Sequence, residues 1–523
     1  MTTPHPHQPH RIGRRLFLGG TGAAVGAGLF AAGSVPAGRP AAADPAGAAA
    51  PTPRWRPLIH FTPERNWIND PNGLVHLDGE FHQFFQYNPG GSDHADMHWG
   101  HSVSTDLVHW EELPVALEPD ELGEVYSGGA VVDHHDDSGF FDGGSGLIAF
   151  YTSAGDEQVQ SLAYSDDNGR SWTMYEGNPV IGNPGIEDFR DPKVVWHAGS
   201  EAWVLMLAAD DRILFYRSSD LREWEEVSGF GPGHGAHGGV WECPELFELP
   251  VDGDDRNTRW VLVVSINPGG PAGGSAAQYF VGDFDGWEFT PHDPPEQTLW
   301  ADGGSDFYAV QSWSDVPAED GRRIWTAWMS NWDYAEDVPT DPWRGAMTLP
   351  REVGLTETAD GIRLTQMPVA EVESARTGNE HWEGELAEGG DGPAFTGTSL
   401  DVELEADPGT ASVVGLEVLA GEGCRTLVGV DLEAGELFVD RSEHGSVEVT
   451  EQFRARHTMP LEHGDGPVRL RVVVDRSTVE AFGGRGQAVI TDLVLPDADA
   501  DVLRPYAEGG TAHVSSLDVH HLE

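Results

Sequence analysis

A short pattern recurs four times along the chain and limits the folds available to it. Each copy is a short run of alternating residues, an Asp-containing turn and a Trp that opens another such run. The Trp residues are Trp110, Trp172, Trp224 and Trp287, so successive copies lie 52 to 63 residues apart. A period of this size built from hairpins is typical of a β-propeller, in which each repeat forms one four-stranded blade. A β-sandwich would also alternate, but it would not repeat a Trp at this interval.

Apolar runs typical of buried strands lie between the copies, as in GLIAFYTS (146–153) and RWVLVVSIN (259–267). At about 60 residues per blade, residues 55–370 hold five blades. Residues 371–385 are polar and Gly-containing, which predicts a linker. Residues 386–523 alternate over short runs separated by turns, as in an antiparallel β-sandwich. We therefore expect an all-β chain with a five-bladed β-propeller followed by a C-terminal β-sandwich.

The N-terminus carries an export pattern. Arg14-Arg15 precede Phe17-Leu18 and a weakly hydrophobic Gly/Ala run that ends near residue 43. This order is typical of a twin-arginine signal, whose passenger crosses the membrane already folded. A membrane anchor is the alternative, but a run so rich in Gly and Ala inserts poorly into a bilayer. We expect residues 1–45 to be a cleaved leader, and the mature protein to be secreted (extracellular) and free of the membrane.

Acidic residues strongly outnumber basic ones, with 87 Asp and Glu against 30 Lys and Arg and a formal charge of −57. They are spread along a chain that also holds 18 Trp and 21 Phe, so an acidic disordered tail does not account for them. An evenly acidic surface repels nucleic acid and anionic membranes, which excludes both as partners. The composition resembles that of extremely halophilic proteins, and we expect a haloarchaeal source. Cys243 and Cys424 are too few for a disulfide framework.

Three acidic residues occur where an unpaired carboxylate is costly to bury: Asp70 in WINDPNG, Asp191 in FRDP and Glu242 in WECP. Their spacing assigns them to the first, third and fourth blades, whose inner strands meet at the propeller axis. Carboxylates that converge there suit hydrolysis of a glycosidic bond with retention, in which one attacks the anomeric carbon and another protonates the leaving group. The alternative is structural, since each acid also fits a turn or a cap.

The same three motifs, in this order, resemble the signatures of glycoside hydrolase family 32, the invertase, inulinase and levanase family. The resemblance extends to FFQYNP (84–89), YSGGAVVD (126–133), GSDFYAVQSW (304–313) and VDRSTVEAF (474–482), and it covers nearly all of the chain after the leader. It implies a five-bladed propeller joined to a β-sandwich. It also implies a secreted retaining exo-β-fructosidase that hydrolyses terminal β-D-fructofuranosyl residues of levan, inulin and sucrose through a covalent fructosyl-enzyme.

On this resemblance, Asp70 is the nucleophile, Glu242 is the acid/base, and Asp191 stabilises the transition state by binding fructose hydroxyls. The residues expected to contact the substrate are Asn69, Gln86, Trp99, Tyr126, Ser127, Arg190 and Trp332, and Trp67 adds apolar wall. The chain departs from the family pattern at His94, where many relatives have Trp, and at Gly129, where relatives often have Ser. Both departures leave the preferred substrate open.

Other functions remain open as well. A fructosyltransferase would use the same catalytic residues, an endo-levanase would need a more open cleft, and a non-catalytic fructan-binding protein would typically lack one of the three acids. His94, His98 and His101 follow no recurring ligand spacing, and the expected chemistry needs no metal, so we expect neither a metal nor a cofactor. The oligomeric state is not predicted.

Overall fold

The structure is a computed structural model that describes residues 53–390, 392–464 and 466–523. The predicted leader, residues 1–45, lies outside the described residues. Within these ranges the helical elements are short 3₁₀ segments: η1 (Ala198–Ser200), η2 (Ala335–Asp337) and η3 (Ala370–Ala375). Nearly all other regular structure is strand, which confirms the all-β prediction. In the described part of the chain, no helix is long and apolar enough to cross a membrane.

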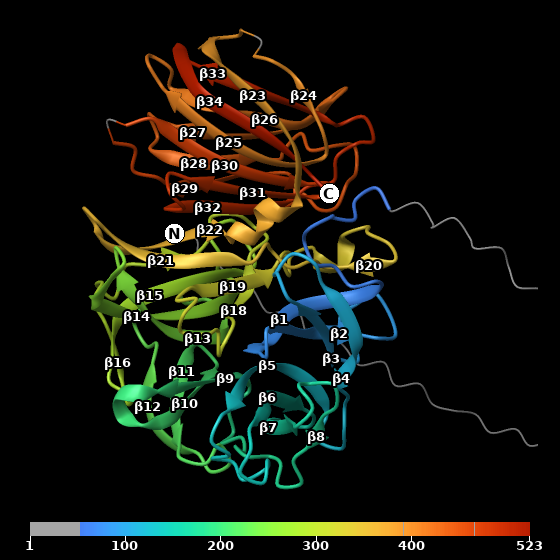
Figure 1. Cartoon of the computed structure of the whole chain (residues 1–523), viewed down its shortest axis with the longest axis vertical. Coiled ribbons are helices and arrows are strands. Elements are labelled where there is room, and N and C mark those ends of the chain that lie inside the picture. Colours follow the sequence, from blue (N-terminus) through green and yellow to red (C-terminus); the bar gives the residue numbers. More distant parts are fainter. Residues whose placement is uncertain (1–52, 391, 465) are drawn as a thin grey trace, which may run out of the picture. The chain divides into compact units, whose positions relative to one another are not determined.

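Five blades form the propeller, the fourth and fifth of them joined in one nine-stranded sheet. Figure 1 shows the innermost strands β1, β5, β9, β13 and β18 facing a common centre. The first blade contains β1 (Asn66–Leu77), β2 (Glu80–Asn88), β3 (His98–Ser104) and β4 (Glu111–Leu117). The second contains β5 (Glu124–Asp133), β6 (Gly146–Ala154), β7 (Gln158–Ser165) and β8 (Thr173–Met174). The third contains β9 (Phe189–His197), β10 (Ala202–Ala209), β11 (Arg212–Ser218) and β12 (Glu225–Phe230).

The last two blades complete the ring. The fourth contains β13 (Val240–Val251), β14 (Asp254–Asn267), β15 (Ala276–Phe284) and β16 (Phe289–Pro291), with β17 (Leu299–Trp300) beside β15. The fifth contains β18 (Tyr308–Ser312), β19 (Arg323–Trp328), β21 (Arg351–Thr358) and β22 (Gly361–Pro368). The short strand β20 (Trp343–Arg344) pairs in parallel with the start of β1, so a segment that follows the fifth blade's second strand closes onto the first blade.

The repeated Trp marks the outermost strand of a blade. Trp110, Trp172 and Trp224 directly precede β4, β8 and β12, and Trp287 lies two positions before β16. The turn before each Trp is held by its Asp. Asp220, for example, accepts hydrogen bonds from two backbone N–H groups that follow it, at 3.0 and 2.9 Å. The repeat in the sequence therefore corresponds to a turn that recurs in successive blades. The structure confirms the propeller that this repeat predicted.

The remaining strands form the predicted β-sandwich from two six-stranded sheets. One sheet contains β23 (Arg376–Ala387), β34 (Thr511–Leu522), β25 (Ser399–Asp407), β30 (Val468–Asp475), β31 (Thr478–Gly483) and β32 (Ala488–Leu493). The other contains β24 (Phe395–Thr396), β33 (Val502–Glu508), β26 (Val413–Gly421), β27 (Cys424–Asp431), β28 (Glu436–Asp440) and β29 (Arg456–Pro460). Their facing side chains, mostly Val, Leu and Ala, form one buried core.

Residues 371–385, expected to be a linker, instead hold most of η3 and most of β23. β23 is an edge strand that pairs with β34, and most of its side chains are exposed. A strand exposed on both faces does not alternate apolar and polar residues. The polar composition of this segment therefore indicated a linker although its backbone is in a sheet.

A buried ionic network joins the propeller chain to the sandwich. The ring of His60 lies between Asp475 and Glu480, with a nitrogen 3.0 Å from a carboxylate oxygen on each side. Arg351, from β21, pairs with the other oxygen of Glu480 at 2.7 Å. All four side chains are fully shielded from solvent. Buried charges are tolerated only when they are paired. The network therefore requires the sandwich carboxylates to be in place beside His60 and Arg351.

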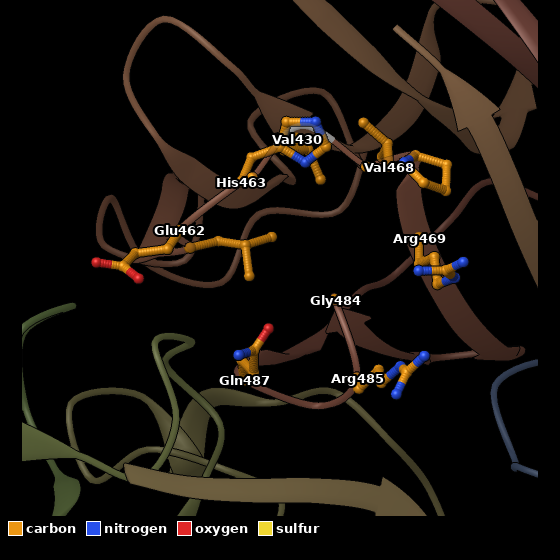
Figure 2. A pocket seen from close by; sticks show the side chains of 12 residues that line it. Val430, Glu462, His463, Val468, Arg469, Gly484, Arg485 and Gln487 are labelled. Carbon is orange, nitrogen blue, oxygen red and sulfur yellow. The ribbon is translucent and has the colours of Figure 1, made fainter. Parts of the chain in front are cut away.

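A hollow of about 260 Å³ lies within the sandwich, between the segment that follows β29 and the β31–β32 hairpin. Figure 2 shows the side chains that line it, among them Glu462, His463, Arg469, Arg485 and Gln487. None of the predicted catalytic acids belongs to it. The predicted acids lie in a second cavity, in the propeller.

Candidate active site

Each blade contributes at least one polar side chain to this second cavity from its innermost strand. Asp70 comes from β1, Ser127 from β5, Asp191 from β9, Glu242 from β13 and Tyr308 from β18. The three acids thus come from the first, third and fourth blades, in agreement with their spacing in the sequence. Their convergence at one cavity favours the functional interpretation over three unrelated turns.

The inner strands are irregular at the height of these side chains. The strand register shifts between Ile68 and Pro71, between Val125 and Gly128, between Glu242 and Glu245, and between Tyr308 and Gln311. In β9 the shift lies opposite Arg190–Lys193, and Asp191 has a positive φ of 65°. β-bulges of this kind turn a side chain out of the regular alternation.

Proline explains why three of these strands bulge where they do. Pro71, Pro192 and Pro244 follow Asp70, Asp191 and Cys243 directly. Proline has no N–H to donate to a neighbouring strand, so within sheets it is found at edges and bulges. The unusual Asp-Pro and Cys-Pro pairs in buried strands therefore direct the preceding residues toward the axis.

The cavity has a volume of about 290 Å³. Its lining residues are Asn69, Asp70, Gln86, His94, Tyr126, Ser127, Gln158, Asp188, Arg190, Asp191, Glu242, Tyr308 and Trp332. All three predicted acids belong to this set, as do six of the seven residues predicted to contact substrate. The exception is Trp99.

Trp99 is fully buried behind the wall of the cavity. Its indole N–H donates to the backbone carbonyl of Tyr126 at 3.0 Å, and its ring packs on Phe84. It thus supports a lining residue and does not line the cavity itself. Trp67 is likewise buried, and its ring stacks on Trp332 with centroids 5.9 Å apart. The sequence does not show whether an aromatic residue near a catalytic motif lines the cavity or is buried behind the lining residues.

Asp70 is held by two donors. The Ser127 hydroxyl donates to Oδ2 at 2.6 Å, and the Asn69 side-chain amide donates to Oδ1 at 3.0 Å. Asn69 is itself fixed by the indole N–H of Trp67 at 2.8 Å. Burial raises the pKa of Asp70, the bond from Ser127 opposes that shift, and the charge of Glu242 adds to it. The carboxylate is therefore oriented in one position and only weakly solvated.

Asp191 lies beside it with a different set of partners. The backbone N–H of Cys243 donates to Oδ2 of Asp191 at 2.9 Å, and the Cys243 thiol lies 3.5 Å from Oδ2 of Asp70. Burial raises the pKa of Asp191 to about 7, although the neighbouring Arg190 guanidinium opposes the shift. Cys243 and Cys424 are both free thiols.

Glu242 is bonded on both carboxylate oxygens. Arg190 donates to Oε1 from Nε at 3.2 Å and from a terminal nitrogen at 2.8 Å, and the Tyr308 hydroxyl donates to Oε2. Arg190 also donates to Asp188 and to Gln158. These bonds hold both carboxylate oxygens of Glu242 in place at the cavity.

Tyr308, Gln158 and Asp188 are the lining residues that the sequence analysis did not identify. Tyr308 had a signal, because it begins the inner strand of the fifth blade, where other blades place their functional residues. Gln158 and Asp188 had none, since they reach the cavity from β7 and from the loop before β9.

The two departures from the family pattern differ in position. His94 lines the cavity, with its ring edge-on to Trp332 at a centroid distance of 5.1 Å. Gly129 is not a lining residue, and a Cβ added there would meet the side chain of Lys193 at 3.0 Å.

The three histidines considered as metal ligands do not meet. His94 lines the cavity, His98 bonds to the backbone of Asp96, and His101 bonds to His82 at 3.1 Å and stacks on Phe84. In the part of the chain that the structure describes, no group of three or more His, Cys, Asp or Glu side chains is arranged to hold a metal ion.

A propeller with carboxylates at its axis and a sandwich behind it defines the chain as a glycoside hydrolase. Residues 60–368 match the model for the glycosyl hydrolases family 32 N-terminal domain, and residues 371–521 match the model for the family 32 C-terminal domain. The chain belongs to glycosyl hydrolase family 32.

The relatives of the chain include levanases and exo-inulinases. A levanase of Bacillus subtilis (strain 168) is 50% identical over 480 residues, covering 90% of this chain and 70% of that protein. The extracellular exo-inulinase of Aspergillus niger is 39% identical over 511 residues, covering 90% of this chain and 94% of that protein.

Solved structures share the fold. The exo-inulinase of Aspergillus awamori superposes with a TM-score of 0.85 at 37% identity, over 90% of this chain and 99% of that one. The β-fructofuranosidase of Schwanniomyces occidentalis, complexed with fructosyl-erythritol, superposes with a TM-score of 0.81 at 31% identity, over 89% of this chain and 97% of that one.

Proposed function

We propose that this chain is a retaining exo-β-fructosidase that removes terminal fructose from levan, inulin and sucrose. The observation that carries the proposal is the convergence of Asp70, Asp191 and Glu242 in one cavity lined by all five blades. The levanase and exo-inulinase relatives support fructans as the substrate class.

The reaction begins with Asp70. Its carboxylate attacks the anomeric carbon of the terminal fructose as the bond from that carbon to the leaving oxygen breaks. Glu242 gives its proton to that oxygen, and the carboxylate that remains is stabilised by Arg190 and Tyr308. A covalent fructosyl-enzyme and a shortened chain are the products of this step.

Water completes the cycle. Glu242 takes a proton from the water as its oxygen attacks the anomeric carbon, and the bond to Asp70 breaks to release fructose with its configuration retained. Asp191, which lines the cavity, binds fructose hydroxyls during both steps. Ser127 and Asn69 stabilise Asp70 as the leaving carboxylate.

The test is product analysis with levan, inulin and sucrose offered separately, beside an Asp70→Asn control of the same size. Free fructose as the sole early product from the polymers, absent in the control, supports the proposal. Short oligosaccharides appearing first indicate an endo-levanase, and longer fructosides from sucrose indicate a fructosyltransferase. If no product forms from any of the three substrates, the remaining interpretation is a non-catalytic fructan-binding protein.

We further propose that the protein is exported by the twin-arginine route and works in concentrated salt, as expected of a haloarchaeal source. Arg14-Arg15 and the formal charge of −57 support this. An Arg14→Lys/Arg15→Lys variant should stay inside the cell, whereas the parent should accumulate in the medium. Activity and melting temperature should both rise from low to multimolar KCl, and a protein most stable without salt would contradict the halophilic proposal.

A further inference from the structure

Two residues of the cavity, Tyr308 and Trp332, lie at or near the end of a strand. Regular strand pairing therefore holds the chain only on one side of each residue. Tyr308 is the first residue of β18, and the segment 301–307 before it is a loop. Trp332 lies between the end of β19 and η2. The Asn331 side-chain amide donates to the backbone carbonyl of Ser305 at 2.8 Å, so the two loops touch one another directly.

A single arginine of the sandwich bonds to both loops. Arg441 follows β28 and donates from one terminal nitrogen to Oδ2 of Asp306 at 2.7 Å. Its other terminal nitrogen donates to the Tyr334 hydroxyl at 2.9 Å. Tyr334 in turn donates to Oδ1 of Asp306 at 2.7 Å, which closes a ring of three side chains.

This ring is adjacent in sequence to both cavity residues. Asp306 lies two residues before Tyr308, and Tyr334 lies two residues after Trp332. The hydroxyl of Tyr308 donates to Glu242, and Trp332 packs on Trp67 and on Trp328. A displacement of the ring therefore changes the donor to Glu242 and the apolar wall together.

Arg441 is held rigidly. Its side chain is fully buried, it also donates to the backbone carbonyl of Leu493 at 2.7 Å, and its guanidinium lies 4.1 Å from the ring centre of Phe453. The planar fork reaches acceptors on separate loops at once, which a lysine ammonium cannot reproduce. A buried charge with this many partners has few alternative arrangements.

We infer that Arg441 is a positioning residue, through which the sandwich sets the Tyr308–Glu242 hydrogen bond and the position of Trp332. The inference rests on the proposed function for its kinetic test. It makes the C-terminal domain part of the geometry of the acid/base, although no sandwich residue lines the cavity.

The kinetic test is a double-mutant cycle between Arg441→Met and Tyr308→Phe. If Arg441 acts through Tyr308, each single change should lower kcat by about 10- to 100-fold, since small displacements of catalytic groups have effects of this size. The double variant should then lose little more than either single one. Multiplied losses, or an unchanged kcat in Arg441→Met, would overturn the inference.

Two further variants separate positioning from general stability. Arg471→Met removes a sandwich arginine that pairs with Asp401 at 2.8 Å and contacts no cavity loop, so it should lower the melting temperature without changing kcat or KM. Tyr334→Phe removes one hydroxyl of the ring, and it should lower kcat and raise KM even if Arg441→Met does not fold. All rates are measured well below the unfolding transition of each variant, and an unaltered Tyr334→Phe enzyme counts against positioning.

A crystal structure of Arg441→Met, or of Tyr334→Phe, gives a readout that does not depend on the reaction. We expect the Tyr308 hydroxyl to have moved from Glu242 and Trp332 to have shifted on Trp67. A parent protein without fructosidase activity would contradict the proposed function alone. A variant structure with both residues in place would contradict the positioning role alone.

Discussion

The hydroxyl of Ser127 donates to Oδ2 of Asp70 at 2.6 Å, from the second blade to the first. A hydrogen bond to a charged group contributes about 2 kcal/mol, which corresponds to about a 30-fold change in rate. We expect Ser127→Ala to lower kcat by about this factor, because the bond stabilises Asp70 as the leaving carboxylate of the second step. Because the bond lowers the pKa of Asp70, its loss should also displace the acidic limb of kcat/KM to higher pH.

Steady-state kinetics across pH measure both effects. Ser153→Ala is a matched control, because Ser153 is a buried serine of the second blade whose hydroxyl bonds to Ser161. Its pH profile should match that of the parent. An unmoved acidic limb in Ser127→Ala would show that the bond does not tune Asp70.

Arg190 connects two of the acids, since it bonds to Glu242 and opposes the burial that raises the pKa of Asp191. Arg190→Gln should therefore lower kcat/KM by about 100-fold or more, as expected for loss of a charged donor at the reacting centre. The pKa of Asp191 should rise further, so activity should require higher pH. Arg217→Gln, which removes an arginine stacked on Trp287, is the control and should keep parental kinetics.

His60 makes stability depend on pH. Burial disfavours its charged form, but the bonds to Asp475 and Glu480 outweigh burial and raise its pKa to about 9. The ordinary pKa of the unfolded histidine is 6.5. The stabilisation is therefore complete below about pH 6.5 and is lost as the pH rises through about 9. We expect the free energy of unfolding to be lower at pH 9.5 than at pH 6 by roughly 3 kcal/mol. The melting temperature should therefore also be lower at pH 9.5.

Calorimetry of His60→Gln and His82→Gln checks this assignment. His82 is also buried, but burial lowers its pKa to about 4, so it is neutral across the whole interval. His82→Gln should retain the difference between the two pH values, and His60→Gln should reduce it. Equal slopes in the parent and in His60→Gln would assign the effect to another group.

The Cys243 thiol should resist alkylation. It is buried between carboxylates, and burial together with the charges of Asp191 and Asp70 raises its pKa well above the ordinary value. The thiolate is the reactive form, so iodoacetamide at pH 8 should not inactivate the native enzyme. Reducing agents should leave the melting temperature unchanged, since both cysteines are free. Rapid inactivation protected by fructose would show instead that the thiol is accessible from the cavity.

Local chemistry explains which features were predictable. The Trp period marks turns that recur along the propeller, and the Asp-Pro and Cys-Pro pairs mark bulges. Both features depend on residues that are neighbours in the sequence, so they can be recognised there. Tyr308 was missed because its role depends on Glu242, 66 residues away along the chain. The edge strand β23 was missed because exposure on both faces removes the apolar alternation. Trp99 was assigned to the cavity because sequence does not show that Tyr126 stands in front of it.

The five bulged inner strands bear on how such a site changes over evolutionary time. Each blade places a side chain at the axis from its bulged inner strand. The strand pairing of the blade does not depend on the identity of that side chain. A substitution at one of these positions can therefore alter a single role while the four other strands keep their register. Selection for a new sugar can act on one blade at a time, with no need to rebuild the ring.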